Sequence, residues 1–361
     1  MLAATLKERI GARVSFLGWD LSEGLMMSHL KAANTPIFRY PLNWDRGGAS
    51  IGARIRSRGR LAGLVRYARN TVKPDYLLPF MTHNSKITAL IWRRAGARYG
   101  WWHQIDEGLH LTGSRLERWL LTRPSDIVAS TTGAKRVLVE RCGVPESRVR
   151  LVPNAIPLRK NFDRREWRER LGVADGDHLV LMAANLTRHK DHPTLLRAFS
   201  LIPGPTIAGG RVRLALAGRL DEKTESLKTL ARELGIAGRV DFLGEVKEMD
   251  PLYVAADVVV HSSVSESMPN AVLEAMANGR CVVATDIPGI SEMLDDEEKE
   301  EVLAPAGDAA ALAERMGRAL SDREFNRRAA ERNRLRTIRL YSPERLCDEV
   351  VKGITEFSLP G

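Results

Sequence analysis

The sequence has few cysteines, few aromatic residues and no long apolar run. Its 361 residues include three cysteines, at positions 142, 281 and 347, which are far apart and lack metal-ligand spacing. No stretch approaches the ~20 apolar residues that cross a bilayer, and the chain does not open with a basic and then apolar signal sequence. These absences predict a reduced, cytoplasmic protein. Any contact of this protein with a membrane would be peripheral, at the inner face of the membrane.

Acidic residues are absent from one strongly basic stretch. Residues 1–155 contain 25 Lys/Arg against 11 Asp/Glu, and Arg46 to Lys73 contains eight basic residues and no acidic one. Arginines there alternate with aliphatic residues, as in an amphipathic helix, which favours contact with an anionic membrane or a diphosphate-bearing lipid. A solvated helix face is the alternative. Nucleic-acid binding is disfavoured, since Tyr67 is the single aromatic residue of the stretch.

Short apolar runs alternate with helix-like segments along most of the chain. This alternation predicts parallel sheets with helices on both faces, in an α/β protein. The expected strands are residues 14–17, 36–40, 75–80, 98–102, 126–129, 149–152, 179–184, 213–217, 240–242, 258–261 and 281–285.

The length of the chain suits two domains rather than one. A break over residues 154–177, with prolines at 153 and 157, separates residues 1–155 from residues 156–340. A helix is expected over residues 341–361. Two doubly wound domains of this kind predict a ligand cleft between them.

Two glutamates eight residues apart flank a predicted helix start. Pro269 suits the first turn of a helix, so the helix begins at Pro269 or Asn270 and ends near residue 278, where Gly279 supplies a stop. Glu266 then precedes the helix and Glu274 lies in its second turn. The free N–H groups between the two carboxylates favour a phosphate-bearing ligand that also carries hydroxyl groups. Two unrelated solvated glutamates are the alternative.

The residues around this pair resemble one family. Residues 266–277 read Glu-Ser-Met-Pro-Asn-Ala-Val-Leu-Glu-Ala-Met-Ala, which is similar to the string E-G-M-P-N-A-x-L-E-A-M-A of the retaining GT-B glycosyltransferases of family 4, the group 1 glycosyl transferases. The resemblance is strong over about residues 126–305. It implies a GT-B fold of two Rossmann-like domains and transfer of a hexose from a nucleoside-diphosphate sugar, with retention, to a glycan or lipid-linked glycan. Cell-envelope polysaccharide synthesis is the expected setting.

The resemblance also implies a donor site in the second domain. Glu274 would hold the donor ribose, Glu266 the hexose, and Lys190 the diphosphate. Asn185 stands where the family has an arginine, although Arg188 lies on the same loop, and Ser267 replaces a glycine beside the donor. The remaining donor-site candidates are Gly218, Arg219, Val246, Met268, Pro269 and Asn270.

The acceptor candidates lie after a predicted strand of the first domain. His103 and Asp106 follow that strand, and ligands bind at the carboxyl ends of strands in such sheets. They would orient or deprotonate an acceptor hydroxyl. A histidine held by backbone hydrogen bonds at the strand end is the alternative.

No metal or cofactor is expected besides the donor substrate. The only Asp-x-Asp sequence is Asp175-Gly176-Asp177, which is better explained as a turn. By the family's mechanism, the departing phosphate would itself help to remove the acceptor proton.

Two other functions are compatible with these residues. Residues 2–9 resemble the first helix of a doubly wound domain, so the first strand and its Gly-rich loop are expected to be missing. That expectation raises the hypothesis of a non-catalytic binding remnant. A nucleotide-sugar 2-epimerase of the same fold is the other alternative, and the Met-Pro-Asn string argues against it.

Overall fold

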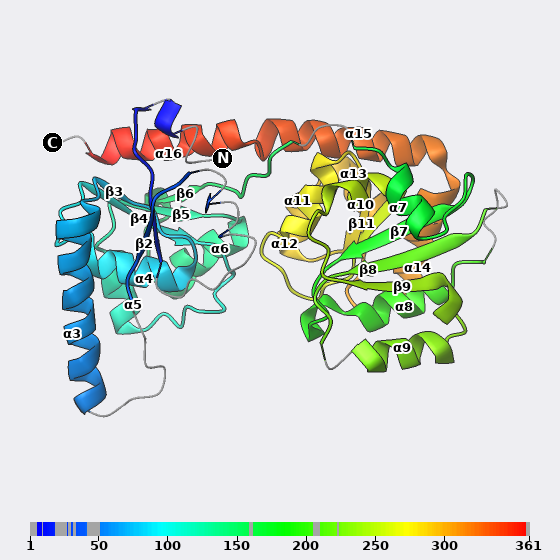
Figure 1. The fold of residues 1–361 in the computed structure, drawn as a ribbon, viewed down its shortest axis with the longest axis horizontal. Helices are drawn as coiled ribbons and strands as arrows, with labels where there is room; N and C mark the ends of the chain where they lie inside the picture. The colour runs from blue at the N-terminus through cyan, green and yellow to red at the C-terminus, as the bar shows by residue number, and fades with distance from the viewer. Residues whose placement is uncertain are drawn as a thin grey trace. The chain divides into compact units, whose positions relative to one another are not determined.

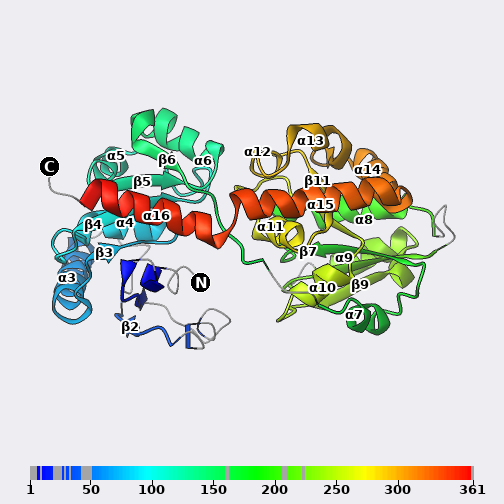
Figure 2. The ribbon, with the colours of Figure 1, turned by 90° about the horizontal axis from the view of Figure 1, so that it is seen from above.

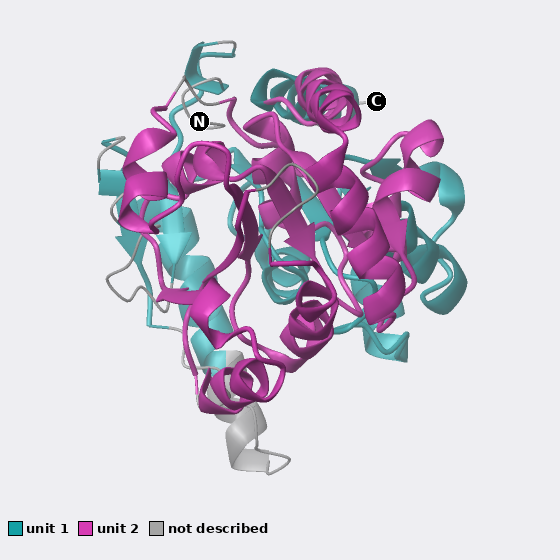
Figure 3. Cartoon of the chain, turned by 90° about the vertical axis from the view of Figure 1, so that its right-hand side faces the viewer, with its two compact units in different colours: residues 1–153, 343–361 teal, residues 154–342 magenta. Residues whose placement is uncertain are grey.

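The chain divides into two compact units, which Figure 3 colours separately. The computed structural model describes residues 6–8, 10–18, 27, 30–31, 34–41, 51–158, 162–204, 210–221 and 224–358, without the side chains of residues 51–58 and 358. Unit 1 comprises Met1–Pro153 and Pro343–Gly361, and unit 2 comprises Asn154–Ser342.

Unit 1 is an α/β unit built on parallel strands. Its four-stranded sheet has the order β3-β4-β5-β6, and a separate parallel pair is formed by β1 and β2. The strands are β1 (Phe16–Gly18), β2 (Ile37–Arg39), β3 (Tyr76–Leu77), β4 (Tyr99–Gln104), β5 (Asp126–Ala129) and β6 (Val149–Leu151). The helices are α3 (Ile51–Tyr67), α4 (Thr82–Ile91), α5 (Arg115–Leu121), α6 (Thr132–Arg136) and α16 (Pro343–Ser358). Residues 6–8 are also helical.

Both faces of the unit 1 sheet are covered. Alternate residues of β4 enter two different cores, Trp102 one and Trp101 the other. The second core includes Val350 and Ile354 of α16, which lies along that face of the sheet and contacts β4 (Figures 1 and 2). The sheet is therefore sandwiched by helices, as the continuous apolar strands predict.

Ion pairs and hydrogen bonds between side chains also hold α16 against the same sheet. Arg150 of β6 makes an ion pair of 2.5 Å with the buried Asp126 and one of 2.8 Å with Glu349 of α16. Tyr99 donates a hydrogen bond of 2.8 Å to Asp126. A side chain in place of Gly353 would bring its Cβ within 2.4 Å of Arg150 Nη2, so α16 packs directly onto this group.

Unit 2 is a six-stranded parallel sheet with the order β12-β11-β10-β7-β8-β9. The strands are β7 (His178–Ala183), β8 (Val212–Ala217), β9 (Val240–Gly244), β10 (Val258–His261), β11 (Cys281–Thr285) and β12 (Leu303–Ala304). The strand order reverses between β7 and β10, and such switch points are where doubly wound sheets bind ligands.

Helices cover both faces of this sheet (Figure 1). They are α7 (Arg165–Arg170), α8 (His192–Ser200), α9 (Thr224–Glu233), α10 (Asp250–Ala255), α11 (Asn270–Ala277), α12 (Pro288–Ser291), α13 (Asp296–Val302), α14 (Ala309–Ser321) and α15 (Arg323–Leu340). The strands are buried in one continuous core. The predicted fold class, two doubly wound α/β domains, is confirmed.

Candidate functional site

Two loops meet at the switch point of unit 2. One follows β7 and carries Lys190, and the other follows β10 and carries Glu266. The hydroxyl of Ser262 donates to the carbonyls of Lys190 and Asp191 at 2.9 and 3.0 Å, and Val264 N–H donates to His189 at 2.9 Å. These bonds hold the two loops together, although they are more than 70 residues apart in the sequence.

Glu266 accepts three hydrogen bonds through one carboxylate oxygen. Its Oε1 forms an ion pair with Lys190, accepts from Ser263 Oγ at 2.9 Å and lies 3.1 Å from Nε2 of His261. In the part of the chain that the structure describes, these hydrogen bonds all go to Oε1 and none to Oε2. Oε2 is therefore able to accept a hydrogen bond from a ligand hydroxyl.

Glu266 is held as a carboxylate. Burial alone would raise its pKa, but the hydrogen bonds from His261 and Lys190 outweigh burial and lower the pKa to about 2. Burial lowers the pKa of His261 in spite of Glu266, so its ring is neutral at pH 7. Glu266 thus keeps a fixed negative charge and is unsuited to act as a general acid.

Glu274 projects from the helix that follows this loop. Helix α11 begins at Asn270 after the N-cap Pro269 and is followed by Gly279 at φ +61°, as the sequence predicts. The buried Tyr253 donates a hydrogen bond of 2.9 Å to Glu274 Oε2. Burial and the nearby Glu274 raise the pKa of Tyr253 well above 10, so this tyrosine stays a donor.

Close backbone packing against β11 and α12 supports the loop that carries Glu266. A Cβ at Gly289, in α12, would lie 1.8 Å from the carbonyl oxygen of Ser267 and 2.4 Å from that of Glu266. Thr285 Oγ1 donates to Ser263 O at 2.5 Å. The position of Glu266 therefore depends on β11 and α12 as well as on its own loop.

The loop after β7 is also joined to the loop after β8. Asn185 Oδ1 accepts from Arg219 N–H at 2.9 Å, and a Cβ at Gly218 would lie 2.0 Å from Ala184 O. Gly218 thus permits this close approach. The side chains of Arg188 and Arg219 are exposed and make no ion pair with any residue that the structure describes.

The remaining donor-site candidates have simpler surroundings. Val246 and Met268 are half-buried and pack against the core of unit 2. Ser267 is half-buried, and Asn270 is exposed, with its Oδ1 accepting from Asn154 at 3.4 Å.

The acceptor-side candidates lie in unit 1. His103 is buried in β4, where its Nε2 lies 3.1 Å from Ser130 Oγ and its Nδ1 has no hydrogen-bond partner among the described residues. Burial lowers the pKa of His103 to about 4. Asp106 accepts from Thr82 Oγ1 at 2.6 Å and from Gly108 N–H at 3.0 Å, so it shapes the loop after β4.

Buried neutral histidines make the stability sensitive to acid. The folded-state pKa values of His103 and His192 are lowered to about 4, below the ~6.5 of an unfolded chain. Their contribution is complete above pH 6.5 and is lost as the pH falls towards 4. Burial raises the pKa of Glu298 to about 7, which works in the opposite direction between pH 4.5 and 7. We expect a net loss of about 2 kcal/mol in the free energy of unfolding from pH 7.5 to 5, measured with urea.

Two variants separate these contributions. Glu298→Gln should lose more stability on acidification than the wild type, because the opposing group is removed. His110→Asn, at an exposed histidine, should behave as the wild type. A stability that stays constant down to pH 5 in Glu298→Gln would contradict the assignment.

Sequence reasoning singled out Glu266, Glu274 and Lys190. The structure brings Lys190 and Glu266 into contact and places Glu274 in α11, the helix that follows Glu266. Sequence reasoning missed His261, Ser263 and Tyr253. The only available signal for His261 and Ser263 was their position at the carboxyl end of a predicted strand. Nothing local to Tyr253 points to Glu274, since α10 and α11 are brought together only by packing.

The described residues show no metal-binding cluster and no membrane-spanning helix. Within the described ranges, no group of three or more His, Cys, Asp or Glu side chains is arranged to hold a metal ion. Asp177 accepts the N–H groups of Arg211 and Ala174, as expected of a turn. None of the described helices has the length and apolar character that crossing a membrane requires.

Comparison with known proteins finds relatives mainly for the second half of the chain. Residues 163–336 match the family model of glycosyl transferases group 1. A D-inositol 3-phosphate glycosyltransferase of Nocardia farcinica is 31% identical over 224 residues, which are 59% of this chain and 48% of that protein. The lipopolysaccharide core biosynthesis glycosyltransferase LpsE of Rhizobium meliloti is 31% identical over 47% of each chain. The chain spans about half the length of these curated relatives.

Solved structures match almost the whole chain. Anabaena Alr3699/HepE in complex with UDP and glucose has a TM-score of 0.80 and 19% identity, and the match covers 98% of this chain and 94% of that one. A glycosyltransferase from Rickettsia africae has a TM-score of 0.79 and 15% identity, with 100% and 94% covered. The chain therefore has the GT-B fold, and its residues 163–336 are similar to the glycosyl transferases group 1 family.

Proposed function

We propose that this protein transfers a hexose from a nucleoside-diphosphate sugar to a glycan or lipid-linked glycan, with retention, in cell-envelope polysaccharide synthesis. The observation that carries the proposal is the Lys190–Glu266 pair at the switch point of unit 2, next to the start of α11. The group 1 match and the bound UDP and glucose of a structural neighbour support it.

Different residues of unit 2 bind different parts of the donor. Lys190 neutralises the charge of the diphosphate. Arg188 and Arg219 are exposed cations in the loops that follow β7 and β8. Glu266 accepts a sugar hydroxyl through Oε2 while His261 and Ser263 hold its other oxygen. The first N–H groups of α11 favour the negative charge of the phosphates.

Glu274 holds the ribose hydroxyls of the donor. Tyr253 orients its carboxylate from the buried side. Because Glu274 lies in the second turn of α11, about one turn from the phosphate-facing N–H groups at its start, ribose and phosphate are bound by one rigid element.

The acceptor binds unit 1 near His103 and Asp106. Since His103 is neutral at pH 7 and its pKa is about 4, it orients the acceptor hydroxyl rather than removing its proton. The proton passes to the departing phosphate oxygen. No metal or organic cofactor is required by this set of residues, in which a lysine and helix N–H groups bind the diphosphate.

Contact with an anionic membrane is proposed through the stretch from Arg46 to Lys73. Arg46 lies outside the described residues, as do the side chains of Arg54, Arg56 and Arg58. In the described part, Leu64 is buried in unit 1, while Arg66, Arg69 and Lys73 are exposed. The membrane contact would thus rest on charge at the cytoplasmic face, with the apolar side of α3 packed in the protein.

Replacing Glu274 by glutamine tests the donor site. The variant should bind the donor 10- to 100-fold more weakly, since hydrogen bonds to a charged group contribute ~1.5–3 kcal/mol. Binding and transfer are measured with a panel of nucleotide sugars, beginning with UDP-glucose, and with radiolabelled hexose. Glu248→Gln, at an exposed glutamate of the same unit, is the matched control.

Three outcomes would reject the proposal. Binding by Glu274→Gln equal to that of the wild type would remove the assignment of the ribose site. Release of an epimerised or free nucleotide product without any acceptor would favour the 2-epimerase. Failure of the wild type to bind any nucleotide sugar would favour a non-catalytic binding protein.

A further inference from the structure

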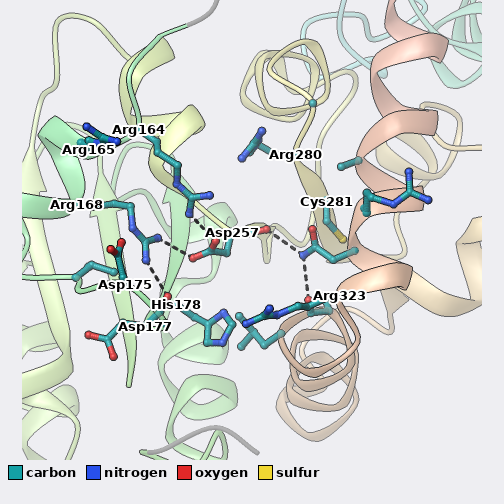
Figure 4. A pocket seen from close by; sticks show the side chains of 18 of the residues that line it. Arg164, Arg165, Arg168, Asp175, Asp177, His178, Asp257, Arg280, Cys281 and Arg323 are labelled. Carbon is teal, nitrogen blue, oxygen red and sulfur yellow. Dashed lines mark hydrogen bonds and ion pairs between the residues drawn. The ribbon is translucent and has the colours of Figure 1, made fainter. Parts of the chain in front are cut away.

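A cavity lies at the amino-terminal ends of the unit 2 strands. It has a volume of about 900 Å³ and is formed by α7, by the starts of strands β7 and β11, by Asp257 just before β10 and by the first turns of α15 (Figure 4). The donor site uses the carboxyl ends of β7 and β10, so the two sites lie at opposite ends of the strands. The volume is within the range of small-molecule pockets.

Arginines dominate the walls of this cavity. Six of them line it: Arg164, Arg165, Arg168, Arg280, Arg323 and Arg327. The central acid is Asp257, which pairs with Arg164 at 2.8 Å and with Arg168 at 3.0 Å (Figure 4). Arg168 also donates to the carbonyls of Ala174 and Asp177, so its role is to hold the fold.

Three of the arginines, Arg165, Arg280 and Arg323, form no ion pair with the described residues. Arg323, the first residue of α15, is exposed, and its side chain makes no hydrogen bond or ion pair with the described residues. Arg280 donates only to the carbonyls of Asn278, Val254 and Ala256. Burial, followed by the charge of Arg164, lowers the pKa of Arg280. The cavity thus holds a cation that its own walls do not neutralise.

The other acidic residues of the wall do not supply this charge. Both carboxylate oxygens of Asp177 accept backbone N–H groups of the turn at residues 174–177 and of residue 211. Asp175 and Glu169 are exposed and form no ion pair within the described ranges. After Asp257 has paired with Arg164 and Arg168, an excess of positive charge remains on the β11 and α15 side.

We propose that this cavity binds a phosphate-bearing anion on its arginine-lined wall, to which Arg164, Arg280 and Arg323 contribute positive charge. A phosphate accepts several charge-assisted hydrogen bonds at once, and guanidinium groups match its geometry. An anion there would neutralise the excess charge of Arg280 and Arg323. This ligand is distinct from the sugar donor, because the donor-site residues lie at the carboxyl ends of the strands.

Calorimetric titration of the full chain with inorganic pyrophosphate tests the site. Arg323→Ala should raise the dissociation constant of this site at least tenfold, and so should Arg164→Ala. Arg328→Ala is the control, since this exposed arginine lies on the same helix outside the cavity. Lys190→Met separates the two sites, because Lys190 lies outside this cavity and its loss should leave pyrophosphate binding there unchanged.

The source of the phosphate is distinguished by a second titration. Vesicles of phosphatidylcholine with phosphatidic acid are sedimented with the wild type and with Arg323→Ala. Pyrophosphate binding that depends on Arg323, without vesicle binding that does, identifies a soluble ligand; vesicle binding that depends on Arg323 identifies a lipid headgroup. If neither pyrophosphate nor vesicle binding changes in Arg323→Ala and Arg164→Ala, with unchanged thermal midpoints, the proposal is wrong.

Discussion

Replacing Lys190 by methionine is expected to lower the rate of sugar transfer 100- to 1000-fold. The departing nucleoside diphosphate gains negative charge in the transition state, and a fixed cation that stabilises such charge contributes about that factor. Methionine keeps most of the length and apolar bulk of the lysine side chain. The effect should appear mainly in kcat, because the charge develops during bond cleavage.

The loss of Lys190 also changes the surroundings of Glu266. His261 and Ser263 still contact its Oε1, so the carboxylate keeps part of its support. Lys247→Met, at an exposed lysine of the same unit, is the matched control for a lost positive charge. Transfer within threefold of the wild type by Lys190→Met, assayed at saturating donor, would show that the diphosphate is bound elsewhere.

Replacing Arg150 by alanine should destabilise unit 1 by about 3–5 kcal/mol. The change removes the cation that pairs with Asp126, whose side chain is 1% exposed, and with Glu349 of α16. A buried carboxylate that loses its partner keeps the cost of leaving water without the compensating attraction. Among the residues that the structure describes, Tyr99 alone would remain as a side-chain donor to Asp126.

The loss of stability in Arg150→Ala should be largest in the C-terminal helix α16. Hydrogen exchange of the amides in α16 should accelerate more than that of the amides in β5, because Arg150 also donates to the carbonyl of Glu349 at 3.2 Å. Urea unfolding measures the total change. Arg148→Ala, at an exposed arginine in the preceding turn, is the control. Equal stabilities of the two variants would contradict the role of Arg150.

Local chemistry made much of the fold predictable. Pro269 and Gly279 mark the two ends of α11 because one favours the first turn and the other adopts a left-handed conformation at low cost. The apolar runs at 258–261 and 281–285 coincide with β10 and β11. Such elements are set by residues within one or two turns of each other, which a sequence displays directly.

The surroundings of the site residues were not predictable in this way. Lys190 and Glu266 are 76 residues apart, and their contact exists because β7 and β10 are neighbours at the reversal of strand order. The resemblance to a family named both residues, but not their pairing. His261 and Ser263 acquire a role only when the loop after β10 folds back beside the strand end.

The sequence by itself determined the α/β class, the helix between the two glutamates and the residue types of a donor site. Periodicity, proline and glycine act locally, so they carry that information along the chain. Only the tertiary structure decided that Glu266 is held as an anion by three donors, that α16 is fastened to β5 and β6, and that arginines from α7 and α15 share a cavity. Each of these depends on long-range packing, which brings together residues that no local pattern connects.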